Sequence, residues 1–453
     1  YVYFNVGQKG GKTNRSEFLK QITMRTILSI IFLTVFSVSN AQTVLTVEDA
    51  VKIALAKNYG ILMARNDAEV TKINNSLGGA GMLPSVSLSG SGGYAISDLK
   101  QTASNGTVTK YNGTTTKSLS TGVELNWTLF DGGKMFVTKQ KLSEIQSLGE
   151  LQLKDQVLST QYDVISAYYN VVRQKQQLAS INEIIKFNVE RVKILQTSFD
   201  AGLAAKNSLL QAKIDLNVYK ENAISQQYNI NTAKKSLNLI LGVSVDTLYE
   251  VIDSIPSGGL INKSEMIQKL FDVNTSILSS QKQVDIAKLA LKEYNRSRLP
   301  IISFSAGYAL SKKDYSSGST KQNITVGPDF QGTISIPLYQ AGRINRQVST
   351  QKLEVETMKY NLENIKQKVS TDLSNAINDY EYQQSMLAIE KENNLLTKEN
   401  LEISIQRLKQ GETTTLEVHQ AQDDYMQSST RLVNFKYNLK VAELKLRQLL
   451  STL

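Results

Sequence analysis

The 453-residue sequence contains no cysteine and a single histidine, and these absences remove much of the chemistry that proteins use. Without cysteine there is no disulfide, no thiolate nucleophile, no cysteine-ligated zinc and no lipid-modified N-terminal cysteine. Because His419 is the only histidine, metal sites with several histidines and most Ser-His-Asp chemistry are excluded as well. The acidic residues follow no spacing that builds an acid/base pair. We therefore expect no enzyme activity, no cofactor and no metal site.

Proline and glycine are also scarce, with 5 Pro and 26 Gly in the whole chain. Average usage is roughly 5% for proline and 7% for glycine, so few residues here interrupt a helix. The net charge is +10, but residues 1–41 carry four of these charges and the remainder is spread along the chain. No basic block and no aromatic RNA-binding motif accompanies them. The charge therefore predicts a solvated basic surface and no nucleic-acid partner.

Residues 24–41 have the pattern of a secretory signal peptide. A basic start, about 12 apolar residues at 27–38 and a small-residue end follow one another in the expected order. A transmembrane anchor is the alternative interpretation, but it needs about 20 apolar residues. Residues 1–23 then lie upstream of the natural start, and the mature chain is expected to begin at Gln42. No apolar stretch of the mature chain approaches the length of a spanning helix, so entry into a membrane would require strands.

An internal repeat organises the rest of the sequence. The segment 83–89 (LPSVSLS) matches 299–305 (LPIISFS), and 128–134 (TLFDGGK) matches 337–343 (PLYQAGR). A third pair, at 199–212 and 408–421, shares a glycine followed by a Gln-Ala pair. The repeats divide the chain into an upstream segment with the signal peptide (1–41), a first repeat (42–262) and a second repeat (263–453).

Each repeat is expected to contain a helix, a strand, a loop, a strand, a long helix, a glycine turn and a final helix. Apolar periodicity predicts the first helices at 46–82 and 263–299, each ended by a proline. The long helices are expected to run to Gly202 and Gly411. At 1.5 Å per residue, about 67 residues give a rod of roughly 100 Å, alongside which the final helix folds back.

The expected strands alternate between apolar and polar residues. They are predicted at about 85–96 and 119–130 in the first repeat and at about 301–310 and 329–338 in the second, separated by polar loops at 97–118 and 311–328. Four such strands cannot close a barrel, and an open sheet edge in lipid leaves backbone groups unsatisfied. Closure therefore requires several chains, and three chains give 12 strands. A soluble sheet on a helical base is the alternative, but the signal peptide and the doubled pattern favour the barrel.

Taken together, these motifs resemble the TolC family of outer-membrane efflux and secretion ducts. The resemblance spans about 46–450 and rests on the paired Leu-Pro, strand-exit and hairpin motifs, which occur in the same order twice. It implies a mainly α fold with a membrane β-barrel: a homotrimer whose 12-stranded barrel, embedded in outer-membrane lipid, continues into a helical tunnel through the periplasm of a Gram-negative bacterium. It also implies two partners, a periplasmic adaptor (membrane fusion protein) and an inner-membrane pump of RND, ABC or MFS type. The channel would open at its periplasmic tip.

The resemblance also implies two sets of functional residues at the periplasmic tip. The gate of the family corresponds to Glu417, Gln420 and Ser208, of which only Glu417 is acidic, so this chain departs from the acidic pattern of its relatives. A trimer would carry one ring of three Glu417 carboxylates, which repel one another and select for cations. A solvated acid on a helix face is the alternative interpretation of Glu417. The adaptor contacts correspond to the hairpin tips, which are Ala201, Gly202, Leu203, Gln410, Gly411 and Glu412.

Two further expectations concern particular side chains. Protonation of His419, close to Glu417, would make opening pH-sensitive, although a lone histidine on a helix face is more often ordinary surface. Trp127, Tyr94 and Tyr308 are expected as membrane-interface aromatics. The competing function for the whole chain is a soluble periplasmic coiled-coil scaffold or adaptor. It explains the rods and the signal peptide but not two strand pairs placed between long helices.

Overall fold

The computed structural model describes residues 44–256 and 262–453, so the predicted signal peptide and the predicted mature start at Gln42 lie outside the described residues. The first repeat contains β1 (Val44–Leu45), α2 (Val47–Lys57), α3 (Tyr59–Asn74), β2 (Ser85–Thr102), β3 (Val108–Asp131), α4 (Lys134–Asp200), α5 (Lys206–Leu241) and β4 (Glu250–Val251). The second repeat contains α6 (Lys263–Val273), α7 (Thr275–Arg296), β5 (Ile301–Tyr315), β6 (Gln322–Ser335), α8 (Arg343–Gln410) and α9 (Thr415–Leu449).

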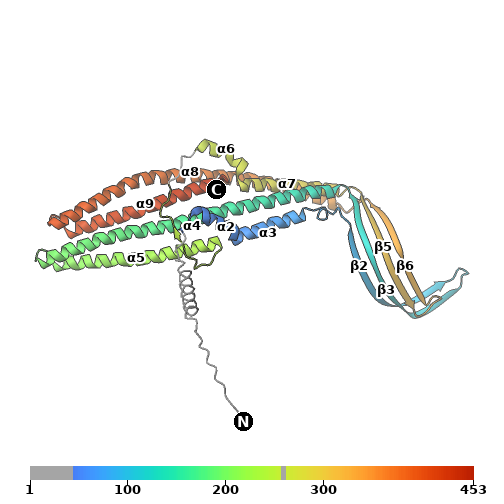
Figure 1. The fold of residues 1–453 in the computed structure, drawn as a ribbon. Helices are drawn as coiled ribbons and strands as arrows, with labels where there is room; N and C mark the ends of the chain where they lie inside the picture. The colour runs from blue at the N-terminus through green and yellow to red at the C-terminus, as the bar shows by residue number, and fades with distance from the viewer. Residues whose placement is uncertain (1–43, 257–261) are drawn as a thin grey trace, which may run out of the picture.

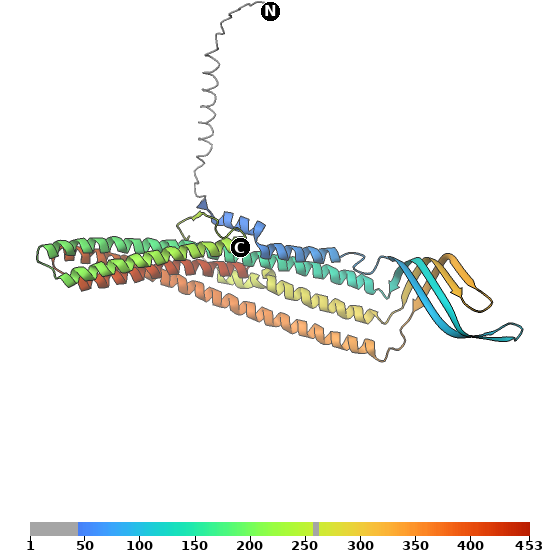
Figure 2. The same cartoon turned by 90° about the horizontal axis from the view of Figure 1, so that it is seen from below.

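The helices form a long rod, and the sheet of β2, β3, β5 and β6 extends from one end of it at an angle (Figure 1). The turns of the α4–α5 and α8–α9 hairpins lie together at the opposite end (Figures 1 and 2). Helix α4 has 67 residues and α8 has 68, which corresponds to about 100 Å each. Within the described residues, no helix combines the length and the apolar character needed to cross a membrane.

Two asparagines divide what the sequence predicts as continuous helices at 46–82 and 263–299. Asn58 separates α2 from α3, and Asn274 separates α6 from α7; both have extended backbone conformations. The Asn274 carboxamide oxygen accepts hydrogen bonds from the amides of Ser276 and Ile277, while its Nδ2 donates to the carbonyl of Leu449 at the end of α9, 2.9 Å away. Asn58 does the same toward α3 and the end of α5. The expectation of one helix was wrong because these side chains cap a new one.

The helices also end earlier than expected, at Asn74 and Arg296. The segment after α3 contains Gly78 and Gly79, whose backbone freedom weakens a helix well before Pro84.

The four long strands form one antiparallel sheet in the order β2-β3-β5-β6. They are longer than expected, because much of the segments 97–118 and 311–328, predicted to be loops, continues the ladder, with Lys100 opposite Lys110. Repeated threonines are β-branched and favour strands despite their polarity, which explains the error. Strand β6 instead ends at Ser335, short of the predicted 338, because Pro337 has no N–H to donate to a ladder.

The apolar core of the rod is a row of separate clusters. One lies between α2, α4 and α5 near the start of the chain, a second between α7, α8 and α9, and two smaller ones near the hairpin turns. Each cluster stabilises its own level of the rod, because burial acts locally on the residues that share it.

We expect the substitution Asn274→Ala to lower the free energy of unfolding by about 1–3 kcal/mol, because it removes a helix cap and leaves the Leu449 carbonyl without its donor. Amide exchange at Ser276 and Ile277, measured by mass spectrometry, should accelerate locally. Asn295→Ala, at an exposed position near the end of α7, is the matched control. Equal effects of the two substitutions would contradict the role of the cap.

Candidate functional site: the membrane sheet, the hairpin tips and the links between the hairpins

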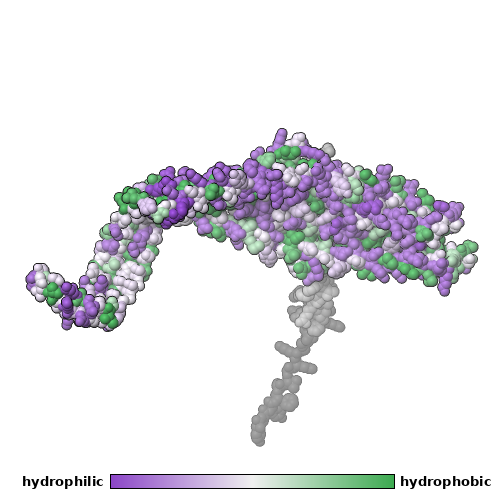
Figure 3. All heavy atoms as spheres, turned by 180° about the vertical axis from the view of Figure 1, so that it is seen from behind, coloured by the Kyte–Doolittle hydropathy of each residue, from purple (hydrophilic) through white to green (hydrophobic). Residues whose placement is uncertain are grey.

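One face of the sheet is continuously apolar. The register sets Leu88 opposite Val123, Val123 opposite Tyr308, and Leu310 opposite Val326, so apolar residues of all four strands share this face. The other face carries mainly Ser, Thr, Asn, Gln and Gly, together with the carboxylates of Glu124 and Asp329. Both faces of the sheet are largely exposed, and pale to green side chains cover it where purple ones dominate the rod (Figure 3). A sheet with one apolar and one polar face, both uncovered, suits lipid outside and water inside.

The three aromatic residues predicted at the membrane interface lie at different heights on the apolar face. Trp127 lies opposite Phe304 near the helical end of the sheet, and its indole N–H donates to the carbonyl of Met82 at 2.9 Å. Tyr94 lies opposite Lys117, where the apolar face gives way to charged residues. Tyr308 lies between these two levels, opposite Val123, in the middle of the apolar face.

The hairpin turns carry the residues predicted to contact an adaptor. Gly202 and Gly411 have φ of 74° and 76°, the left-handed conformation that a tight reversal between helices requires. Leu203 follows the first glycine and is 85% exposed. Leu416 in the second hairpin is 74% exposed and forms a second apolar point that the sequence motif did not single out. Ala201, Gln410 and Glu412 are exposed as well.

Glu417 lies in the first turn of α9, where local hydrogen bonds hold it. The Thr414 hydroxyl oxygen caps the helix by accepting from the Glu417 amide at 3.2 Å, and the Thr413 hydroxyl donates to the Glu417 carboxylate. This arrangement resembles a capping box and orients the acid at a helix N-terminus, where negative charge is stabilised.

The other two predicted gate residues are not brought into contact with Glu417 in the described chain. Gln420 lies one turn further along α9 and donates to Asp424 at 2.9 Å, which places a second exposed carboxylate on this side of the helix. Ser208 lies in the first turn of α5, and its amide is bound within its own hairpin by Asn207 and Ala205.

A buried polar network above the turns joins the two hairpins. Arg191 of α4 is 1% exposed; its guanidinium donates to Asp215 of α5 at 2.9 Å and to the side-chain oxygen of Gln422 of α9 at 3.1 Å. The Tyr219 hydroxyl of α5 donates to Asp423 of α9 at 2.8 Å. Burial and the neighbouring Asp423 raise the pKa of Tyr219, so the phenol remains a donor. Sequence patterns missed this network because its members are far apart in the chain.

A second set of contacts joins the hairpins further up the rod. Glu183 of α4 accepts from Lys398 of α8 at 2.8 Å and from the Tyr425 hydroxyl of α9 at 2.7 Å. Burial acts to raise the pKa of Glu183, but these hydrogen bonds outweigh it and hold the pKa below its usual value. Lys409 of α8 pairs with Glu190 of α4 at 2.5 Å. Near their turns, the two hairpins are therefore joined by polar contacts as well as by the apolar cluster that contains Ile184, Leu401 and Val418.

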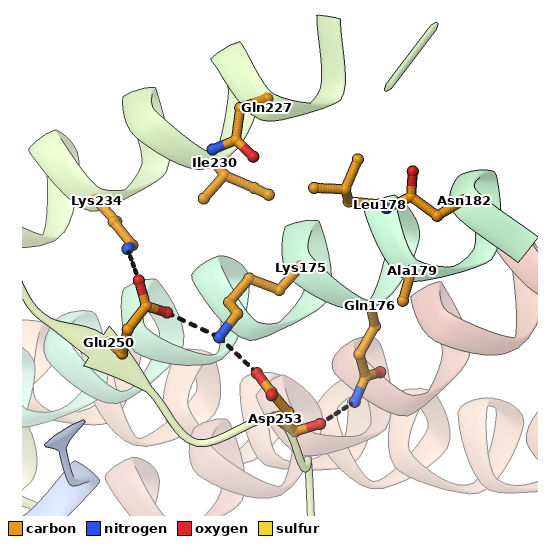
Figure 4. A pocket seen from close by; sticks show the side chains of 10 residues that line it. All are labelled: Lys175, Gln176, Leu178, Ala179, Asn182, Gln227, Ile230, Lys234, Glu250 and Asp253. Carbon is orange, nitrogen blue, oxygen red and sulfur yellow. Dashed lines mark hydrogen bonds and ion pairs between the residues drawn. The ribbon is translucent and has the colours of Figure 1, made fainter. Parts of the chain in front are cut away.

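A pocket near the middle of the rod, of about 470 Å³, is lined by α4, α5 and the segment around β4 (Figure 4). Lys175 bridges Glu250 and Asp253 at 3.0 and 2.6 Å, and Lys234 binds Glu250 at 2.8 Å. The charged side chains drawn in Figure 4 are thus paired with one another. These ion pairs hold Glu250 and Asp253, in the segment between the repeats, against helices α4 and α5. Across the described residues, no group of three or more His, Cys, Asp or Glu side chains is arranged to hold a metal ion.

The Lys175–Glu250–Lys234 cluster predicts acid sensitivity. The hydrogen bond from Lys234 is the main reason that the pKa of Glu250 lies below its ordinary value of 4.5; burial opposes this shift and Lys175 adds to it. A lowered folded-state pKa contributes stability that is present above the unfolded value and is lost as pH falls through the folded value. We expect Glu250→Gln to lower the melting temperature at neutral pH and to flatten its decline below about pH 4.5. Thermal melts across pH, with the exposed Glu69→Gln as control, measure this; parallel curves for wild type and Glu250→Gln would contradict it.

Comparison with known proteins agrees with this architecture. The family model described as "Outer membrane efflux protein" matches residues 50–243 and 266–452. The chain is 23% identical over 330 residues to the outer membrane efflux protein BepC of Brucella suis, covering 71% of this chain and 69% of that protein. It is 22% identical over 355 residues to the outer membrane protein TolC of Escherichia coli, covering 76% and 71%.

Solved structures show the same fold. CusC superposes with a TM-score of 0.73 at 18% identity, covering 89% of this chain and 91% of CusC. The outer membrane protein VceC of Vibrio cholerae superposes with a TM-score of 0.71 at 16% identity, covering 89% and 96%. The family match favours a channel over a soluble scaffold. The chain belongs to the outer membrane efflux protein family, whose members are outer-membrane channels with a β-barrel and a long periplasmic helical tunnel.

Proposed function

We propose that three copies of this chain form an outer-membrane channel without enzyme activity, which receives its cargo from a periplasmic adaptor and an inner-membrane pump of RND, ABC or MFS type. The observation that carries the proposal is that one chain has two incomplete edges along its entire length. Each edge has the features needed to pair with the opposite edge of another copy.

The order of the helices defines these edges. Near the hairpin turns, α5 packs on α4, α4 on α9, and α9 on α8, so α5 and α8 are the outer members. Near the sheet, α3 packs on α4, α4 on α7, and α7 on α8, so α3 and α8 are the outer members. Helix α8 therefore follows one edge throughout, and α3 and α5 follow the other.

Exposed apolar residues follow both edges. On α8, Tyr382, Ile389, Leu396 and Ile403 recur every seven residues, and each is more than half exposed. Such a heptad stripe is typical of a coiled-coil face that packs on another helix. The opposite edge exposes large apolar side chains on α3 (Tyr59, Met63, Val70 and Ile73) and on α5 (Leu210, Ile214, Val218, Ile224 and Tyr228).

The sheet continues the same two edges. Strand β2 follows α3 and strand β6 precedes α8, and in the described chain each has a hydrogen-bonded neighbour on one side only. In hydrocarbon, the unpaired N–H and C=O groups of both strands require partners, and β6 of one copy pairing with β2 of the next supplies them. Three copies then contribute 12 strands and a ring of 12 helices at each level.

The native mass of the mature chain, extracted with detergent from separated outer membranes, tests this proposal. We expect a trimer that inserts into planar bilayers as a water-filled channel. A monomer, or a protein recovered from the soluble periplasm, would return the helical scaffold as the better interpretation.

The proposed gate predicts a change in ion selectivity. In a trimer, the three Glu417 carboxylates repel one another and attract cations at the narrow end of the tunnel. We expect Glu417→Gln to lower the cation-over-anion permeability ratio by about two- to threefold, measured from reversal potentials across a salt gradient. Glu265→Gln, on the exposed helix α6, should leave the ratio unchanged. If the permeability ratio of Glu417→Gln equals that of the natural sequence, Glu417 takes part in the helix cap but does not set ion selectivity.

The proposed adaptor contact predicts a loss of transport without a loss of stability. Because the Leu203 side chain is 85% exposed, Leu203→Ser removes little packing from the channel itself. We expect it to lower efflux by the assembled system and binding of the purified adaptor several-fold, while trimer mass and melting temperature stay constant. Leu248→Ser, at a 76% exposed position between α5 and β4, is the matched control. Equal efflux by the two variants would exclude this tip from adaptor docking.

A further inference from the structure

The single histidine of the chain lies between two carboxylates that belong to different hairpins. His419 projects from α9; its Nδ1 is 3.5 Å from Oδ2 of Asp215 on α5, and its Nε2 is 3.5 Å from Oδ2 of Asp423 on α9. Asp215 is buried, whereas the His419 side chain is 37% exposed and is therefore open to exchange of protons with water. Among the described residues, the buried Nδ1 has no hydrogen-bond partner. Both distances are too long for a good hydrogen bond to neutral imidazole but suit ion pairs to imidazolium.

The charges around His419 do not balance while its imidazole is neutral. Arg191 of α4 contributes one positive charge, and Asp215 and Asp423 contribute two negative charges. With a neutral imidazole, this network keeps one unbalanced negative charge in partly buried surroundings. Protonation of His419 balances it, and burial of charge costs least when the charges are paired.

The remaining groups near this site do not change that balance. Tyr219 of α5 is neutral and donates to Asp423, because burial raises the pKa of its hydroxyl. On the side of α8, Lys409 is paired with Glu190 of α4, which adds no net charge.

We propose that His419 is a proton-operated latch between the two hairpins of each chain. When the imidazole is protonated, its ion pair to Asp215 holds the α8–α9 hairpin against the α4–α5 hairpin, while its ion pair to Asp423 lies within α9. When it is neutral, that ion pair is lost, whereas the Arg191–Gln422 and Tyr219–Asp423 hydrogen bonds, the apolar contacts between Ile184 and the α8–α9 hairpin and the ion pairs further up remain. This inference rests on the proposed function, in which the hairpins separate to open the channel, and it gives that opening a dependence on periplasmic pH.

Distance measurements between the hairpin tips test the latch directly. Because the natural chain has no cysteine, Leu203→Cys and Leu416→Cys provide two unique, exposed positions for nitroxide labels. Co-expression with an excess of the cysteine-free chain keeps each assembly to one labelled copy, so the distance read by pulsed electron paramagnetic resonance is within one chain whatever the oligomeric state. We expect the ratio of near to far tip populations to rise about five- to tenfold between about pH 7.5 and 5.5.

Two variants distinguish the effect of protonating His419 from the effect of side-chain packing. His419→Gln keeps a polar side chain of similar size that does not titrate, and we expect its tip distances to be the same at both pH values. Asp423→Asn removes the ion pair within α9 and leaves the one to Asp215, and we expect the pH response of the tip distances to remain. A pH response retained in full by His419→Gln would overturn the latch, and so would constant distances in the natural sequence.

Conductance of the same samples in planar bilayers keeps the two proposals distinguishable. Tip distances that respond to pH in a protein that forms no channel would uphold the latch and refute the proposed function. A conducting trimer whose tip distances do not change with pH would support the proposed function and refute the latch.

Discussion

The constraint on which the structure depends is that a backbone N–H or C=O group cannot remain unpaired in hydrocarbon. A sheet of four strands with two open edges violates it, and in the trimer that we propose these edges are completed when copies join β6 to β2. The helices obey the same geometry, because α3 and α5 continue the β2 side and α8 continues the β6 side. One closure condition in the membrane thus sets the arrangement of the whole periplasmic rod.

Much of this architecture could be predicted from the sequence, because it depends on periodicity and on breakers. The scarcity of proline and glycine predicts the long helices, and α4 and α8 end within two residues of Gly202 and Gly411. The repeat locates the strands. Their lengths were underestimated, since threonine-rich segments are polar in composition yet β-forming in conformation. The helix breaks at Asn58 and Asn274 were missed, because a capping asparagine does not interrupt apolar periodicity.

The residues of the candidate site also fall into those that local sequence could predict and those that it could not. Features fixed by local geometry could be predicted: Gly202 and Gly411 lie in the turns between helices, and Trp127 lies on the apolar face of its strand, as the alternation of residues indicates. The links between the hairpins depend on contacts across more than 200 residues, such as Arg191 with Gln422, and no local pattern records these. An arginine at helical spacing from Ile184 and Leu195 was the signal available, but its partners could be identified only after folding. The lone His419 was visible in the composition, whereas its two carboxylates were not.

The separate apolar clusters along the rod give the molecule a graded, segmental stability. The cluster nearest the first turn contains only Leu195, Leu209 and Ala212 as buried members, far fewer than the clusters near the middle. Fraying of the turn between α4 and α5 therefore exposes little apolar surface, while the larger clusters keep their packing. The tip behaves as a flexible end on a stiff support, so its sequence can diversify toward new partners without loss of the barrel or the tunnel.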